Sequence, residues 1–144
     1  MTHSGEGPRL LLVEDNPDDV AVALRAFRRH RLDTIIDVVD NGVRALDYLQ
    51  EAERGERALP SVVLLDLKMP DVDGIDVVKA MRASEGTRHV PVVMISSSSR
   101  RIDIESSYRS GVNSFVVKRV EPDRPGEYLV DVARYWLGLN KHLQ

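Results

Sequence analysis

The sequence has 144 residues, a net charge of −3 and no cysteine. This length suits one domain with its own core, and the absence of cysteine excludes disulfides and thiolate metal sites. The sequence contains no basic stripe, no long apolar run and no signal peptide, so we expect a cytoplasmic protein that binds neither nucleic acid nor membrane.

Short apolar runs bounded by turn residues predict five β-strands. Segments with helical spacing lie between these runs, so strand and helix alternate along the chain. Continuous apolar strands are typical of a parallel sheet that helices cover on both faces, with right-handed crossovers. The predicted strands are Leu10–Val13, Ile35–Val39, Val62–Leu65, Val92–Ile95 and Phe115–Val117.

The predicted helices begin with clear local signals. Asn16 fits the N-cap of the first helix, and Pro17 suits its first turn. Asp18 and Asp19 follow, where negative charge favours the positive end of the helix dipole. Gly74 begins the third helix.

Polar side chains stand at the ends of four predicted strands. Glu14 and Asp15 follow the first strand, and Asp66 follows the third. Ser96 and Lys118 follow the fourth and fifth. Because reactive groups gather at the carboxyl ends of the strands of a parallel sheet, these residues should converge. Three crowded carboxylates repel one another, so the cluster requires a divalent cation and an ammonium group.

These residues, in this order, resemble a response-regulator receiver domain. The resemblance implies a flavodoxin-like α/β fold, a doubly wound (βα)5 sheet with strand order 2-1-3-4-5. It places a receiver domain at residues 9–139, between a disordered N-terminal tail (1–8) and a C-terminal tail (140–144). It also implies a single-domain response regulator that accepts a phosphoryl group from a kinase histidine onto Asp66, with Mg²⁺ as cofactor, and that is not itself an enzyme.

The resemblance implies a role for each site residue. Asp15 and Asp66 bind Mg²⁺ directly, the backbone carbonyl of Lys68 completes the protein ligands, and Glu14 acts through water. Lys118 neutralises a phosphoryl oxygen. Ser96 donates a hydrogen bond to the phosphoryl group, although Ser97 and Ser98 stand close enough in the sequence to take its place.

A conformational switch is also implied. Once Asp66 carries phosphate, Ser96 moves toward it and vacates space that Phe115 fills by turning inward. An equally good interpretation of Phe115 is an ordinary core aromatic. Most receivers have proline after the lysine, but Lys118 is followed by Arg119. We therefore predict a trans peptide there, because a cis bond without proline is costly.

Two short segments resemble the stand-alone regulators that are paired with cyanobacterial and bacterial phytochromes. They are residues 14–19 and residues 135–140, with the sequences EDNPDD and YWLGLN. This likeness implies that the partner is a sensor histidine kinase regulated by light.

Two alternatives remain open. An aspartate-nucleophile phosphatase of the haloacid-dehalogenase type would place an acid two residues after its nucleophile, where this chain has Lys68. A degenerate receiver that acts only as a scaffold is disfavoured by the complete acidic set.

The last predicted helix, Tyr128–Leu139, has more apolar surface than one packed face needs. On a regular α-helix its apolar residues spread over about 220°, well beyond a stripe of about 100°. The excess predicts a homodimer through this helix. The residues assigned to the dimer contact are Tyr128, Val132, Tyr135, Trp136 and Leu139.

Overall fold

The computed structural model describes residues 7–143 as an alternation of strands and helices. The strands are β1 (Arg9–Val13), β2 (Ile35–Val39), β3 (Val62–Asp66), β4 (Val92–Ser96) and β5 (Ser114–Val117). The helices are α1 (Pro17–Arg29), α2 (Gly42–Glu53), α3 (Gly74–Ala83), α4 (Arg101–Ser110), α5 (Glu127–Arg134) and the π-helix η2 (Tyr135–Leu139). Each predicted strand is confirmed, with its ends within one residue.

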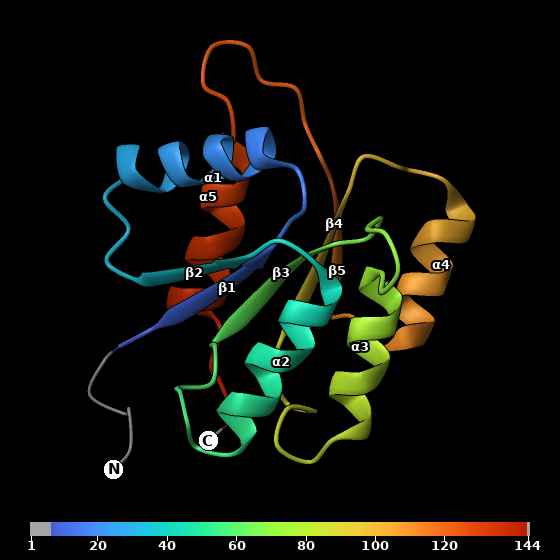
Figure 1. The fold of residues 1–144 in the computed structure, drawn as a ribbon. Coiled ribbons are helices and arrows are strands. Elements are labelled where there is room, and N and C mark those ends of the chain that lie inside the picture. Colours follow the sequence, from blue (N-terminus) through green and yellow to red (C-terminus); the bar gives the residue numbers. More distant parts are fainter. Residues whose placement is uncertain (1–6, 144) are drawn as a thin grey trace.

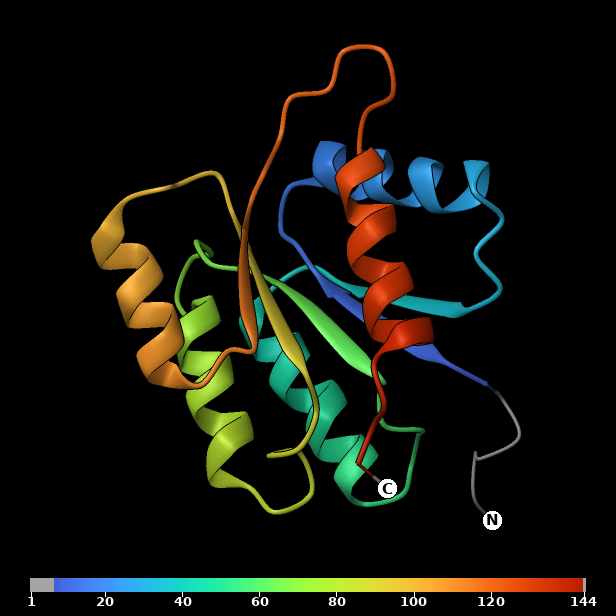
Figure 2. The same ribbon diagram turned by 180° about the vertical axis from the view of Figure 1, so that it is seen from behind.

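The five strands form one parallel sheet in the order β2-β1-β3-β4-β5. This order confirms the predicted flavodoxin-like fold. Helices α1 and α5 cover one face of the sheet, and α2, α3 and α4 cover the other (Figure 1). The view from behind shows α5 running along the face that it shares with α1 (Figure 2).

The core consists of two apolar clusters, one on each face of the sheet. Because successive side chains of a strand point to opposite faces, Leu10 and Leu12 of β1 join the cluster under α1 and α5. Leu11 and Val13 join the cluster under the other three helices. Strands β3 and β4 are buried along their whole length. The strands that carry Asp66 and Ser96 are therefore enclosed by packed side chains on both faces of the sheet.

Local signals set the helix starts as predicted. The side chain of Asn16 accepts hydrogen bonds from the backbone N–H groups of Asp18 and Asp19. Gly74 begins α3 directly beside the end of β3. A Cβ added there would lie 2.6 Å from the backbone oxygen of Asp66, so only glycine fits this close approach. The packing of α3 against the strand end thus holds the backbone of Asp66 in place.

The prediction of one regular α-helix over Tyr128–Leu139 is wrong in its second half. The α-helix ends at Arg134 and continues as η2, where the N–H of Asn140 bonds to the carbonyl of Tyr135 five residues earlier. Gly138 lies in this segment, and glycine has little preference for the tighter α-helical turn. The wheel of 100° per residue therefore does not describe residues 135–139.

Residues 1–6 of the predicted N-terminal tail lie outside the described residues. Pro8 is described, and its carbonyl accepts hydrogen bonds from the backbone of Ile35 and the hydroxyl of Thr34. Of the predicted C-terminal tail, residues 140–143 are described and belong to no helix or strand. Within residues 7–143, no helix has the length and apolar character that a membrane span requires.

Candidate functional site

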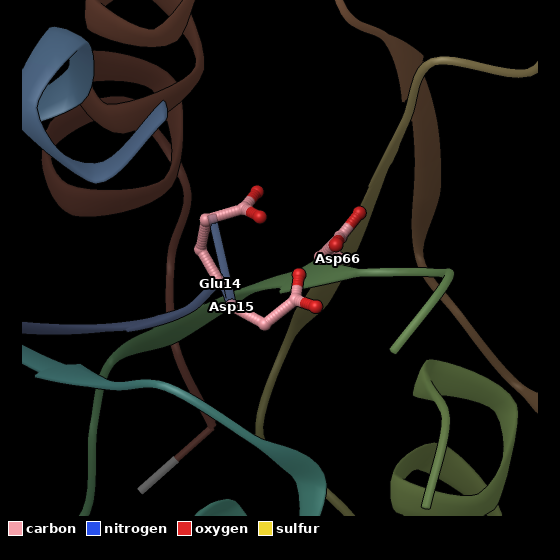
Figure 3. A group of neighbouring side chains, drawn as sticks. All are labelled: Glu14, Asp15 and Asp66. Carbon is pink, nitrogen blue, oxygen red and sulfur yellow. The ribbon is translucent and has the colours of Figure 1, made fainter. Parts of the chain in front are cut away.

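Three carboxylates meet where β1 and β3 end. One oxygen from each of Glu14, Asp15 and Asp66 lies within 4.8 Å of the other two. Figure 3 shows the three side chains converging on one region from these two strand ends. Glu14 and Asp66 are buried, whereas Asp15 is exposed. Carboxylate oxygens at this spacing can hold a hard divalent cation such as Mg²⁺ or Mn²⁺.

The environment of Asp66 disfavours its ionised form. Burial and the charge of Glu14 raise the pKa of Asp66 to about 7, and the ammonium of Lys118 only partly offsets them. A cation that enters the site would stabilise the ionised form of this carboxylate. The same residues that repel one another without metal therefore form a favourable set of metal ligands.

Lys118 brings an ammonium group into the cluster from the end of β5. Its Nζ lies 2.8 Å from Asp19 Oδ2, 2.9 Å from Glu14 Oε2 and 3.6 Å from Asp66 Oδ1. Burial alone would lower the pKa of Lys118, but the bonds to Asp19 and Glu14 outweigh it and the pKa is raised. The described residues contain no cis peptide, so the bond to Arg119 is trans, as predicted.

The backbone places the ends of β3, β4 and β5 side by side. Ile95 pairs with Asp66 across β3 and β4, so Ser96 stands one residue beyond the strand partner of Asp66. The N–H of Lys118 donates to the carbonyl of Ser96 at 2.7 Å. Parallel pairing thus brings the predicted serine and lysine to the same edge as the acids.

Three serines that follow one another at the end of β4, residues 96–98, differ in their hydrogen bonds and surroundings. Ser96 is buried, and its Oγ accepts a bond from the N–H of Ser98 at 3.0 Å, which leaves the hydroxyl hydrogen for another acceptor. Ser98 donates its own hydroxyl to Asp103 at 2.5 Å. Ser97 lines the cleft beside Asp66. Ser98 is therefore engaged with Asp103, whereas Ser97 lines the cleft and Ser96 is buried at the end of β4.

A second ion pair lies on the other side of Asp66. Lys68 donates from Nζ to Asp103 Oδ1 at 3.3 Å, with its side chain 68% exposed. Hydrogen bonds from Ser98 and then from Lys68 lower the pKa of the Asp103 carboxyl. The side chain of Lys68 thus joins the β3–α3 loop to α4.

A cleft of about 740 Å³ runs from the acidic cluster to the loop between β5 and α5. Its charged lining includes Asp15, Asp19, Asp66 and Lys118. The loop of residues 118–126 rises beside α1 (Figure 1). Gly126 in this loop has a φ of +82°, and an added Cβ would lie 3.0 Å from the carbonyl oxygen of Val22. The loop therefore approaches α1 closely at the wall of the cleft.

Among the other predicted functional residues, Tyr128 lines the cleft that also holds the carboxylates. Phe115 is partly buried and packs against the core cluster under α2, α3 and α4. Tyr128, Val132 and Trp136 are also partly buried and pack against the opposite cluster. Tyr135 and Leu139 are the exposed members of the predicted dimer set, with 47% and 81% of their surface accessible.

Two site residues were missed in the sequence. Asp19 was assigned only to the helix dipole, but its carboxylate binds Lys118. Asp19 lies in the first turn of the helix that follows Glu14 and Asp15, and this position could have indicated that its carboxylate belongs to the same cluster. Asp103, the partner of Lys68, gave no such signal because it lies 35 residues further along the chain.

The model of the response regulator receiver domain matches residues 10–128. The chain therefore belongs to the response-regulator receiver family, and it is a receiver of two-component signalling. The probable methanogenesis regulatory protein FilR2 of Methanothrix harundinacea (strain 6Ac) is 38% identical over 132 residues, covering 92% of this chain and 85% of that protein.

Two solved structures are similar over almost their whole length. The phosphorylated cyanobacterial phytochrome response regulator RcpA superposes with a TM-score of 0.85 at 26% identity, covering 96% of this chain and 99% of that one. The bacteriophytochrome response regulator AtBRR gives 0.73 at 40% identity, covering 96% and 98%. The structural neighbours of this chain therefore include regulators of phytochrome signalling.

Proposed function

We propose that Asp66 is the phosphoacceptor of this receiver and takes its phosphoryl group from the histidine of a sensor kinase. The observation that carries the proposal is the convergence of Asp66 with two further carboxylates, whose oxygens lie within 4.8 Å, and with the ammonium group of Lys118, 3.6 Å away. An oxygen of Asp66 bonds to phosphorus while the bond from phosphorus to the kinase imidazole nitrogen breaks. The electron pair of that bond returns to the imidazole.

Phosphoryl transfer depends mainly on positioning and on neutralising the phosphoryl oxygens, so the chain needs little covalent chemistry beyond the attack. Asp15 and Asp66 are the direct ligands we assign to Mg²⁺, with the carbonyl of Lys68 as a third and Glu14 acting through water. When bound, the metal supplies positive charge to the phosphoryl oxygens. Lys118 supplies the second positive charge, and Ser96 donates its hydroxyl.

The output is a conformational change that begins at the same strand ends. Ser96 turns toward the phosphoryl group on Asp66, and Phe115 turns into the space that it leaves. Phe115 is a residue of β5, and its partial burial against the core cluster under α2, α3 and α4 supports this role. In this proposal the partners are a sensor histidine kinase and the target that reads the new surface.

The phosphodonor we propose is a kinase of the phytochrome class, because RcpA and AtBRR, to which this chain is similar, are phytochrome response regulators. The test is phosphoryl transfer from an autophosphorylated bacteriophytochrome kinase and, in parallel, from a histidine kinase without a light-sensing module. Faster transfer from the phytochrome supports the pairing. Equal or slower transfer from the phytochrome contradicts it and leaves the phosphoacceptor assignment intact.

We also propose a homodimer through the C-terminal helical segment. The exposed Tyr135 and Leu139 continue an apolar surface that Tyr128, Val132 and Trp136 share with the core. The rings of Tyr135 and Trp136 meet edge to face with centroids 5.0 Å apart, which gives this surface a rigid aromatic centre.

Sedimentation at micromolar concentration tests the dimer. We expect wild type to sediment as a dimer and Tyr135→Asp as a monomer. The control is Tyr108→Asp, which places the same charge on an exposed tyrosine of α4. A wild-type protein that is monomeric with and without phosphate contradicts the dimer.

An aspartate-nucleophile phosphatase is the weaker candidate function for this chain. Receiver domains act as phosphoacceptors rather than as classical enzymes, and the chain belongs to that family. Lys68 occupies the place where the phosphatase needs an acid, and its ammonium pairs with Asp103.

A further inference from the structure

We propose that Asp19 is a positioning residue that holds the ammonium of Lys118 on the α1 side of Asp66. By doing so it sets the balance between metal binding and phosphoryl binding at the site. The inference rests on the proposed phosphoacceptor role of Asp66, and it concerns the free protein as well as the phosphorylated one.

The distances show which acid the lysine favours. Nζ of Lys118 lies 2.8 Å from Asp19 and 2.9 Å from Glu14, and both contacts are hydrogen bonds. Its separation of 3.6 Å from Asp66 is longer than a hydrogen bond. The ammonium therefore forms hydrogen bonds with Glu14 and Asp19, and its interaction with Asp66 is only a longer-range ion pair.

The two favoured acids are themselves held in place. Glu14 uses Oε1 to accept the N–H of Asn16 at 3.1 Å, so that only Oε2 turns toward Lys118. Asp19 lies in the first turn of α1, and its N–H donates to the side chain of Asn16 at 3.4 Å. One N-cap residue thus organises both partners of the lysine.

The direction of the effect follows from charge. Lys118 divides one positive charge among three carboxylates, so neutralising Asp19 moves the ammonium toward Asp66. A closer ammonium repels Mg²⁺ and attracts a phosphoryl oxygen. Asp19→Asn should therefore weaken metal binding and strengthen binding of a phosphoryl analogue. The side chain of Asp19 is 42% exposed, so the effect is modest, as for other partly solvated ion pairs.

A matched control exists one residue away. Asp18 carries the same charge in the same first turn, and within residues 7–143 its carboxylate makes no hydrogen bond or ion pair. Asp18→Asn removes the same charge from the helix without releasing the lysine. Asp19→Glu keeps the charge and extends the side chain, so it should restore most of the wild-type behaviour.

The experiment is a calorimetric titration of the full chain with Mg²⁺ alone, followed by titration with beryllofluoride at saturating Mg²⁺. We expect Asp19→Asn to bind Mg²⁺ about threefold more weakly and beryllofluoride about threefold more tightly. Asp18→Asn should change each affinity by less than about 1.5-fold. When Lys118 is replaced by Gln, Asp19→Asn and Asp18→Asn should change the Mg²⁺ affinity by the same small factor.

Two results overturn the inference. One is that Asp19→Asn and Asp18→Asn change the two affinities equally, because the effect would then come from the loss of a negative charge in general. The other is a full Asp19→Asn effect on Mg²⁺ in the absence of Lys118. Failure of the proposed function appears differently: wild type would then bind neither beryllofluoride nor phosphate, whereas the Mg²⁺ titrations would still test the role of Asp19.

Discussion

Two lysines flank Asp66, and their surroundings differ. The side chain of Lys118 is 22% exposed and faces three carboxylates: Glu14 directly after β1, Asp19 in α1 and Asp66 at the end of β3. Lys68 is 68% exposed and binds one carboxylate, that of Asp103 in α4. Both side chains are long and cationic, and both lie near the end of a strand that carries a site residue.

The two side chains are of the same type, so burial is the difference from which we expect Lys118 to have the larger effect on Asp66. Charges interact more strongly where water is excluded, so the pairs of Lys118 act on the pKa of Asp66. The Lys68–Asp103 pair is screened by solvent and links the β3–α3 loop to α4. Asp66, the phosphoacceptor that we propose, thus lies between one electrostatic partner and one surface contact. The following substitutions measure how much the effects of the two lysines differ.

Removing Lys118 should have the largest effect. Lys118→Gln removes the only ammonium that we place against the phosphoryl oxygens, and loss of one preorganised donor typically costs about 100-fold in rate. The rate of phosphorylation by acetyl phosphate measures this loss. A reduction of less than about fivefold would show that the metal alone supplies the positive charge.

Removing Asp15 should weaken the metal site next. Asp15→Asn takes away a carboxylate ligand, so Mg²⁺ affinity should fall about tenfold or more. Asp103→Asn is the comparison on the Lys68 side, and we expect its Mg²⁺ affinity to match wild type. Calorimetry of the metal alone measures both, and equal losses would place the metal elsewhere.

The raised pKa of Asp66 predicts a pH-dependent stability. Its carboxyl titrates near 4 when unfolded and at about 7 when folded, so the unfolded state loses its proton first as pH rises. Stability therefore falls between about pH 4 and pH 7 without divalent metal. Asp66→Asn should match wild type near pH 4 and be more stable by about 1–2 kcal/mol at pH 8.

Urea unfolding at the two pH values measures this prediction. The control is the same pair of measurements with saturating Mg²⁺, which should shrink the gain at pH 8 because the metal relieves the same repulsion. A gain that is equal at both pH values would contradict the raised pKa.

The smallest effect is expected at Lys68. Because its side chain is mostly exposed, Lys68→Gln should change the rate of phosphorylation by acetyl phosphate by less than about threefold. Raising the salt concentration should reduce even that difference. A change as large as that for Lys118→Gln would show that the exposed lysine reaches the phosphoryl group.

The fold and the acidic cluster could be predicted because they depend on strong, local patterns. Continuous apolar runs located the strands, and polar residues at the ends of four of the five runs indicated the candidate site. Asn16 marked a helix start because its side chain can accept hydrogen bonds from the first turn. Gly74 marked another because a helix that starts so close to a strand has no space for a Cβ atom.

Contacts between distant residues could not be predicted in this way. The pairing of Lys68 with Asp103 joins positions 35 residues apart, and no periodicity links them. The π-helix at Tyr135–Leu139 was missed because helix-wheel arguments assume 3.6 residues per turn. The pairing of Asp19 with Lys118 was missed for another reason: the helix dipole already explained an acidic residue in the first turn of α1, so no partner was sought.

The most direct test of the account is the site of phosphorylation. The protein is incubated with acetyl phosphate and Mg²⁺, and mass spectrometry of wild type and Asp66→Asn determines whether and where a phosphoryl group is bound. The account predicts one phosphoryl group on Asp66 of wild type, none on the variant, and none on wild type when the metal is chelated. A phosphorylated Asp66→Asn protein, or a wild type that accepts phosphate equally well without metal, would contradict it.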